Sequence, residues 1–415
     1  MSPSAHKCTP ATAQGAADSH RPLSALLSQT LVAFTVELDN EFELRMKRLG
    51  FSGGRLSLAV WLNLLRFVGD KPTSVADLAA QSLFEQNEIK GMLGCLERWR
   101  FVWLDSPGAD ENAGPISQKL TRRGVREDWG SGRGINRRTT VGLTPMGVSA
   151  REVWEPLPNA IEDRWRKRFG EAADGLRSAL EAIPMDSDLP LGFVDIGWRN
   201  RAFPAKTGGP GPELPLPSLL SRLLLTFAGE FEPRSDAPLA QCANTIRVLS
   251  EEPTPEAELP RLTGCSPENC GFGWQLKPFV AVGPDPNAKR GKALRLTTRG
   301  LLAQQQYGHL TTEIEQGWEN RFGKERVARL RSALLRLFDL EGNGRHPLLL
   351  SEGLVPPPGV VRAGDSAPAL GRMVAASAAL KRMRDLVAQT QAFVADPTHS
   401  LPHYPMLDMN RGFGP

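Results

Sequence analysis

The sequence lacks the features that mark membrane, secreted and disulfide-rich proteins. No stretch approaches 18 uninterrupted apolar residues, which argues against a membrane span. The five cysteines are scattered and odd in number, so they do not read as a disulfide framework and favour a reducing compartment. Residues 1–22 are polar and contain no apolar middle of the kind found in signal peptides. We therefore expect a disordered N-terminus over 1–22 and a cytoplasmic protein with no membrane contact.

Motifs of catalysis and metal binding are also missing. The sequence has no HExxH and no GxSxG, and no phosphate-binding glycine motif follows a predicted strand. The GSGRG stretch at Gly130–Gly134 lies in a basic loop and does not open a helix. Cys265 and Cys270 are spaced more widely than a usual zinc pair, and a second pair is lacking. We expect no enzymatic activity, no cofactor and no metal.

The composition that remains is that of a soluble globular protein. The 415 residues suggest two or three units, and 40% hydrophobic with 23% charged residues supply an ample core. The formal net charge is only +4, which permits nucleic-acid binding without requiring it. The distribution of charge therefore matters more than its sum.

The chain contains an internal duplication, because three blocks recur in the same order in its two halves. The second block has six identical positions in ten, including both tryptophans. The pairs are LLSQTLVAF (Leu26–Phe34) with LLSRLLLTF (Leu219–Phe227), IEDRWRKRFG (Ile161–Gly170) with IEQGWENRFG (Ile314–Gly323), and LRSAL at Leu176–Leu180 with LRSAL at Leu330–Leu334. Repetition in register predicts two copies of one structural unit. Trp165 and Trp318 are expected to pack between the long helices.

The blocks divide the chain into repeats and connecting segments. We expect a first repeat over 23–184, a second over 216–344, a Pro/Gly-rich linker over 185–215, and a C-terminal extension over 345–415. Within the extension, apolar residues at helical spacing predict a helix near 367–395. The last 20 residues hold four prolines and two glycines among polar groups, which indicates a loose tail.

Periodicity and capping residues predict the order of elements in the first repeat. The expected helices are Ser24–Leu49, Leu56–Val68, Thr73–Ala80, Glu85–Arg98, Pro145–Arg168 and Ala172–Ile183, and the expected strands are Phe101–Leu104 and Thr139–Leu143. This is the order of a winged helix-turn-helix flanked by long helices. The fold class we expect is mainly α with small β-wings, as two winged helix-turn-helix repeats joined through long dimerisation-type helices.

These residues resemble the MarR family of bacterial transcriptional regulators. Leu78-Ala79, Leu96-Glu97 and Phe101-Val102 are similar to the family's helix-turn-helix. The stretch from Asn136 to Gly147 resembles its Asp-Arg-Arg … Leu-Thr-x-x-Gly wing, and the stretch from Lys289 to Gly300 is a second copy. The threonine should end the second wing strand and cap the following helix. The resemblance covers both repeats but neither the linker nor the residues after Gly344.

Family members are usually homodimers that place two recognition helices in successive major grooves. The resemblance therefore implies a bacterial, cytoplasmic, repressor-like regulator of double-stranded DNA in which one chain supplies both halves as a monomeric pseudo-dimer. Half-sites would then lie about 34–36 Å apart. A homodimer would follow instead if the helix near 367–395 adds an interface. A small-molecule effector in the cleft between reader and dimerisation helices is also implied.

The first repeat carries the clearest candidates for DNA contact. Its wing region holds seven basic residues against two acids, interleaved with Gly and Ser, which suits a loop that follows phosphates or enters a minor groove. These residues are Lys119, Arg122, Arg123, Arg126, Arg133, Arg137 and Arg138. In the recognition helix, Gln86 and Asn87 can read adenine edges and Lys90 can reach guanine or phosphate, whereas Glu85 and Glu88 would repel phosphates. A solvated loop without a partner remains the alternative.

The second repeat is weaker as a reader. Its wing offers Lys289, Arg290, Lys292 and Arg295. The stretch that corresponds to the recognition helix, Ser266–Trp274, contains one proline and two glycines, which disfavour a helix. Four acids precede it, at Glu251, Glu252, Glu256 and Glu258. The alternative function is accordingly a protein-interaction or scaffold protein of winged-helix ancestry that has lost sequence-specific DNA binding.

Overall fold

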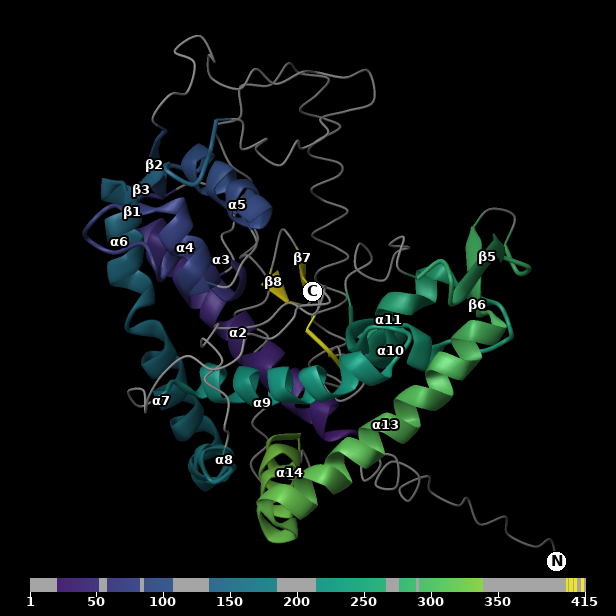
Figure 1. Cartoon of the computed structure of the whole chain (residues 1–415). Coiled ribbons are helices and arrows are strands. Elements are labelled where there is room, and N and C mark those ends of the chain that lie inside the picture. The colour runs from purple at the N-terminus through teal and green to yellow at the C-terminus, as the bar shows by residue number, and fades with distance from the viewer. Residues whose placement is uncertain are drawn as a thin grey trace, which may run out of the picture.

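The structure is a computed structural model and describes residues 21–51, 58–82, 86–106, 134–184, 214–265, 276–288 and 291–338, together with positions 401, 403–405, 407–408 and 412–413. The described residues are mainly helical and form two three-stranded antiparallel sheets and one two-stranded sheet (Figure 1). The predicted class, mainly α with small β elements, is therefore confirmed. The predicted helix near 367–395 lies outside the described residues, as do residues 1–20 and 185–213.

The first half runs from the long helix α2 to α8. Its elements are α2 (Leu23–Arg48), α3 (Leu58–Leu65), β1 (Thr73–Ser74), α4 (Val75–Ser82), α5 (Gln86–Arg98), β2 (Val102–Asp105), β3 (Thr140–Leu143), α6 (Pro145–Trp154), α7 (Leu157–Phe169) and α8 (Glu171–Glu181). Strand β3 lies between β1 and β2 and pairs antiparallel with both. The strands 102–105 and 140–143 form the pair that the sequence predicts.

The second half follows the same order in its described elements, and the residues that correspond to α5 lie outside the described part of the chain. Its elements are α9 (Leu216–Phe231), η1 (Glu232–Arg234), α10 (Leu239–Asn244), η2 (Ile246–Val248), β4 (Thr254–Pro255), η3 (Glu256–Glu258), α11 (Leu259–Thr263), β5 (Val280–Pro284), β6 (Lys292–Leu296), α13 (Thr298–Phe322) and α14 (Lys324–Phe338). Its sheet has the order β4-β6-β5, which matches β1-β3-β2 strand for strand. The two halves therefore share one topology.

The prediction of a single helix from Pro145 to Arg168 was wrong. The structure ends α6 at Trp154 and begins α7 at Leu157. Pro156 and Pro158 fall at this break, and proline removes a backbone donor and clashes with the preceding turn. The second half has no proline between Thr298 and Phe322, so α13 runs through without a break.

A threonine caps the helix after each sheet, as the Leu-Thr-x-x-Gly element predicts. The Thr144 hydroxyl accepts a hydrogen bond from the Gly147 N–H at 3.1 Å, and the Thr297 hydroxyl accepts one from the Gly300 N–H at 3.1 Å. Each threonine backbone is extended and each hydroxyl satisfies one donor that the first helical turn leaves unpaired.

The glycine of the same element is required by close packing. A Cβ on Gly147 would lie 2.0 Å from the carbonyl oxygen of Phe101, and one on Gly300 would lie 2.1 Å from that of Phe279. Backbone atoms cannot move aside as a flexible side chain can. Only glycine lets the helix start directly against the residue that precedes the first strand of the hairpin, β2 or β5.

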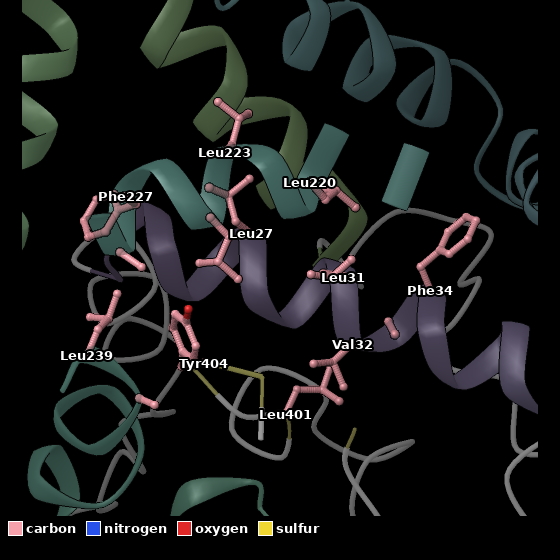
Figure 2. Close-up of a cluster of buried hydrophobic side chains, with 14 of the residues drawn as sticks. Leu27, Leu31, Val32, Phe34, Leu220, Leu223, Phe227, Leu239, Leu401 and Tyr404 are labelled. Carbon is pink, nitrogen blue, oxygen red and sulfur yellow. The ribbon is translucent and has the colours of Figure 1, made fainter. Parts of the chain in front are cut away.

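The two halves meet through their first and last helices. Helix α2 packs against α9, and α8 packs against α14, so the helices cross between the halves (Figure 1). Figure 2 shows Leu27 and Leu31 of α2 beside Leu220 and Leu223 of α9, all four of them buried. One continuous core therefore runs through both halves.

The repeated tryptophans lie inside this core. Trp165 and Trp318 are both fully buried. The Trp165 ring meets that of Phe34 edge to face at a centroid distance of 5.2 Å, and the Trp318 ring meets that of Phe227 at 5.7 Å. The prediction that both tryptophans pack between the long helices is confirmed, and each partner is the phenylalanine that ends the first repeated block.

The expected loose tail was contradicted at its described residues. Leu401 is fully buried and Tyr404 is 2% exposed. Strands β7 (Leu407–Asp408) and β8 (Gly412–Phe413) pair with each other, and β8 packs against α2 and α3. Apolar residues between the prolines of this segment are buried, and the local composition does not predict that burial.

Candidate nucleic-acid interface

Residues of the repeated blocks bind the first half to the start of α9. The Glu162 carboxylate in α7 accepts hydrogen bonds from Nε and Nη2 of Arg177 in α8, at 2.5 and 2.7 Å. The same carboxylate accepts the Leu216 N–H at 3.4 Å, and Arg177 donates to the carbonyl oxygen of Leu214 at 3.1 Å. Helix α9 has Pro215 at its N-cap and no side-chain cap of its own. The first half therefore supplies the cap that α9 lacks.

The second half makes the same contact with the start of α2. The Glu315 carboxylate in α13 accepts the Leu23 N–H at 2.6 Å and also pairs with the Arg331 guanidinium of α14. Arg331 donates in turn to the carbonyl oxygen of Arg21 at 2.6 Å. Helix α2 begins after Pro22 and likewise has no side-chain cap of its own.

We call these two sets of contacts the Glu–Arg clamps. Glu162 and Glu315 occupy one position of the repeated Ile-Glu block, and Arg177 and Arg331 occupy one position of LRSAL. Each half thus holds the first helix of the other through equivalent residues, which is the reciprocal pattern of an interface with twofold symmetry. Sequence reasoning missed the clamps, although the identity of these residues between the repeats was a visible signal.

A second ion pair is also present in both halves. The Arg168 guanidinium pairs with the Glu37 carboxylate, and both side chains are only 8% exposed. Burial raises the pKa of Glu37 above its ordinary value, although Arg168 acts against that rise. The equivalent pair, Arg321 with Glu230, is 2.6 Å long and much more open, with side chains 48% and 31% exposed. The halves keep the same contact in different surroundings.

A polar cavity of ≈ 310 Å³ lies beside the first clamp. Its lining residues are Asn159, Glu162, Arg166, Arg177, Leu214 and Pro215. Arg166 adds a further hydrogen bond to Glu162 at 2.8 Å, so the clamp carboxylate is already satisfied. The small-molecule effector expected from the family resemblance stays a prediction.

Two of the predicted wing arginines project from the edge of the first sheet. Arg137 and Arg138 are both exposed, in the turn that leads into β3. The Arg138 N–H donates to Asn136 Oδ1 at 2.8 Å, and the Ala76 N–H of α4 donates to the carbonyl oxygen of Arg137 at 3.1 Å. The backbone beneath both guanidinium groups is therefore tied to α4.

The other candidates in the first half are placed only in part. Gln86 and Lys90 lie in the first turns of α5, and both are half-buried. Ile89, Leu93 and Leu96 of α5 are buried in the core. The polar residues in the first turns of α5 therefore lie at the boundary between its buried face and its exposed face. The side chain of Asn87 lies outside the described residues, as do Glu85, Lys119, Arg122, Arg123, Arg126 and Arg133.

In the second half, two basic residues face outward from β6. Lys292 and Arg295 are exposed, while Ala293 and Leu294 between them are buried. The described residues do not include Lys289 and Arg290. They also do not include 266–274, the stretch that corresponds to the recognition helix. The acids that precede the reader are at the surface: Glu251, Glu252 and Glu258 are exposed and Glu256 is half-buried.

The two sheets lie at opposite ends of the protein. Figure 1 shows β2 and β3 at one side of the view and β5 and β6 at the other, with α8 and α14 away from both. We call β1–β3 with α3, α4 and α5 the first lobe, and β4–β6 with α10 and α11 the second lobe. The first lobe carries Arg137 and Arg138, and the second lobe carries Lys292 and Arg295. The crossed helices between them fix the distance between the lobes.

Among the described residues, no group of three or more His, Cys, Asp or Glu side chains could hold a metal ion, and no helix is long and apolar enough to cross a membrane. The side chains of Cys95, Cys242 and Cys265 are buried. Burial raises the pKa of Cys242 to about 12, which keeps that thiol protonated at neutral pH.

Comparisons of the chain with models of known protein families, with curated proteins and with solved structures found no match.

Proposed function

We propose that this chain is a cytoplasmic DNA-binding transcriptional regulator, repressor-like in type, in which two MarR-like winged-helix repeats form an intramolecular pseudo-dimer. The observation that carries the proposal is the reciprocal pair of Glu–Arg clamps. Glu162 holds the start of α9 and Glu315 holds the start of α2, as two subunits of a symmetric dimer would hold each other. Among the described residues, each half has a short strand, then a helix, then a two-stranded hairpin after its first helices, an order that is compatible with a winged helix.

DNA contact would come mainly from the first lobe. Arg137 and Arg138 are exposed on a hairpin base whose backbone is fixed, which suits guanidinium contact with phosphates or a minor groove. The second lobe offers Lys292 and Arg295 but also a surface rich in glutamate. Partial repulsion of phosphate is expected at that lobe, so the two halves would contribute unequally.

The test is binding of the purified chain to genomic DNA fragments across a salt series. A regulator should enrich discrete fragments, and the logarithm of its affinity should fall steeply with the logarithm of salt concentration. Replacing both Arg137 and Arg138 by alanine should weaken binding and reduce the salt slope by about 2, roughly one unit for each lost phosphate contact.

The matched control is the double change Arg329→Ala and Arg336→Ala. Both residues are exposed on α14, away from the two sheets, and the net charge changes by the same amount. This control should keep the salt slope of the original chain. Failure of the original chain to bind any DNA at low salt would end the proposal, as would equal slopes for the two double variants.

The second candidate function is a winged-helix-derived interaction or scaffold protein. The exposed acids Glu251, Glu252 and Glu258 favour it, because they precede the stretch that corresponds to the recognition helix and would repel phosphates. In that case, protein partners would be recovered with the chain while DNA is ignored. Light scattering distinguishes a monomeric pseudo-dimer from a homodimer, and we expect the mass of one chain.

A further inference from the structure

Described residues close to the C-terminus lie inside the protein. Leu401 is fully buried, while His403 and Tyr404 expose only 8% and 2% of their surfaces. Figure 2 shows Leu401 beside Val32 of α2, and Tyr404 between α2 and Leu239 of α10. Side chains from both halves of the molecule therefore surround this segment.

Two buried side-chain amides hold the backbone of the segment. Asn244, the last residue of α10, donates from Nδ2 to the carbonyl oxygen of Tyr404 at 2.9 Å and accepts the Tyr404 N–H on Oδ1 at 3.1 Å. Gln29 of α2 donates from Nε2 to the carbonyl oxygen of Leu401 at 3.0 Å. An amide that binds both backbone groups of one residue imitates the pairing of a strand, which is how proteins recognise extended peptides.

The segment continues from the second half to the first. Strand β8 packs against α2 and α3, whereas Tyr404 is held by α10. The segment thus contacts α2, α3 and α10, and Figure 1 shows β7 and β8 near these helices. We call the residues of α2, α3 and α10 that contact the segment its groove. The segment bridges the two sheet-bearing lobes and the helical core.

The contacts that join the two halves do not depend on this segment. The packing of α2 on α9 and of α8 on α14 uses residues up to Phe338, and so do both Glu–Arg clamps. Leu401 and Tyr404 add side chains to the core that those helices form, and Tyr404 reaches Asn244 across 160 positions of sequence. The contacts of the segment therefore resemble those between a protein and a bound peptide.

We propose that the C-terminal residues Leu401, His403–Pro405, β7 and β8 act as a tethered peptide ligand. The groove between α2, α3 and α10 is their binding site, with Asn244 as the residue that fixes the peptide backbone. The segment opens and closes while the core stays folded, and in the bound state it ties the α10 lobe to α2. The inference stands whether or not the chain binds DNA.

Hydrogen exchange of the full chain, followed by mass spectrometry, tests this binding. In the original chain the peptide that contains Tyr404 should exchange more slowly than an unstructured sequence but faster than the centre of α13. Asn244→Ala removes both hydrogen bonds to Tyr404, so exchange of that peptide should become at least about tenfold faster. Tyr404→Ala should speed exchange in α10, although the substitution lies 160 residues away.

Asn287→Ala is the matched control, because Asn287 is exposed in the turn after β5 of the same lobe. It should leave the exchange of the Tyr404 peptide unchanged, and all three variants should keep the slow exchange of α13 that reports an intact core. Exchange of the Tyr404 peptide at the unstructured rate in the original chain would overturn the proposal. Equal rates in the Asn244→Ala variant and the original chain would do the same, and so would exchange of the segment only together with α13.

Discussion

Removal of the Glu162 carboxylate should destabilise the protein more than any other single change in the clamps. The Glu162 side chain is 5% exposed and that of Arg177 is 14% exposed. Glu162→Ala therefore leaves a largely buried guanidinium with only the Glu181 carboxylate, which is 47% exposed, as its partner. Breaking a buried pair from one side costs about 3–5 kcal/mol, and because Glu181 remains we expect a loss near the lower end of that range. The lost cap at the start of α9 is the smaller part of this loss, because a cap contributes about 0.5–2 kcal/mol.

The equivalent change in the second half should cost less. Glu315 and Arg331 have side chains 19% and 24% exposed, so water can solvate the arginine that Glu315→Ala leaves behind. We expect a loss of about 1.5–3 kcal/mol, which is typical of hydrogen bonds to charged groups. The order of the two variants, with Glu162→Ala the less stable, follows from burial alone.

The assay is urea unfolding monitored by far-ultraviolet circular dichroism, with the double variant Glu162→Ala and Arg177→Ala to complete a cycle. The double variant should recover part of the loss, because it no longer buries a guanidinium that has lost its main partner. Glu152→Ala, at an exposed position of α6, is the control and should change the free energy of unfolding by less than about 0.5 kcal/mol. If Glu162→Ala lowers the free energy of unfolding by less than about 1 kcal/mol, the inference that this clamp is a major polar contact between the two halves is refuted.

Three further outcomes are expected. Gly300→Ala should lower the free energy of unfolding by about 1–3 kcal/mol or more, because its Cβ would meet a backbone carbonyl at 2.1 Å. Gly308→Ala on the same helix meets nothing within 4 Å and should stabilise by about 0.5–1 kcal/mol, and the same urea titrations compare the two. The pKa of Glu37 is raised above 4.5, so the folded protein holds that proton more tightly than the unfolded chain does. Stability relative to Glu37→Gln should therefore fall as pH rises from about 4.5 through the raised value and stay level below it; a difference that grows with pH would contradict this. Cys242, with its pKa raised to about 12, should not react with a thiol reagent at neutral pH until the protein is unfolded.

Local rules predicted the parts of this fold that neighbouring residues decide. Thr144 and Thr297 cap helices because their hydroxyls reach an N–H three residues on, and this distance is visible in sequence. Trp165 and Trp318 recur with the aromatic residue that ends the first block, which made a shared core expected. The exposed position of Arg137 in the hairpin turn also followed from the strand pattern.

The parts that escaped prediction depend on residues far apart in the chain. Glu315 caps α2 across 292 positions, and no local pattern specifies which helix end a glutamate will meet. The helical spacing of apolar residues predicted one long helix despite Pro156 and Pro158. The helix breaks there because proline lacks the backbone N–H that the helix needs. The burial of Tyr404 could not be predicted from the prolines around it, because helices distant in the sequence make the contacts that bury this irregular segment.

Fusion of the two units in one chain allows equivalent contacts to diverge. In a homodimer both copies of an ion pair have the same burial, whereas Glu37–Arg168 is buried here and Glu230–Arg321 is open to solvent. The Glu–Arg clamps occur in both halves, and each of them holds the start of one first helix against the other half. The lobes do not form these contacts between the halves. The first lobe can therefore retain exposed arginines while exposed glutamates accumulate on the second. If the chain reads DNA as proposed, its two half-sites need not be palindromic, since the surfaces that meet them are no longer the same.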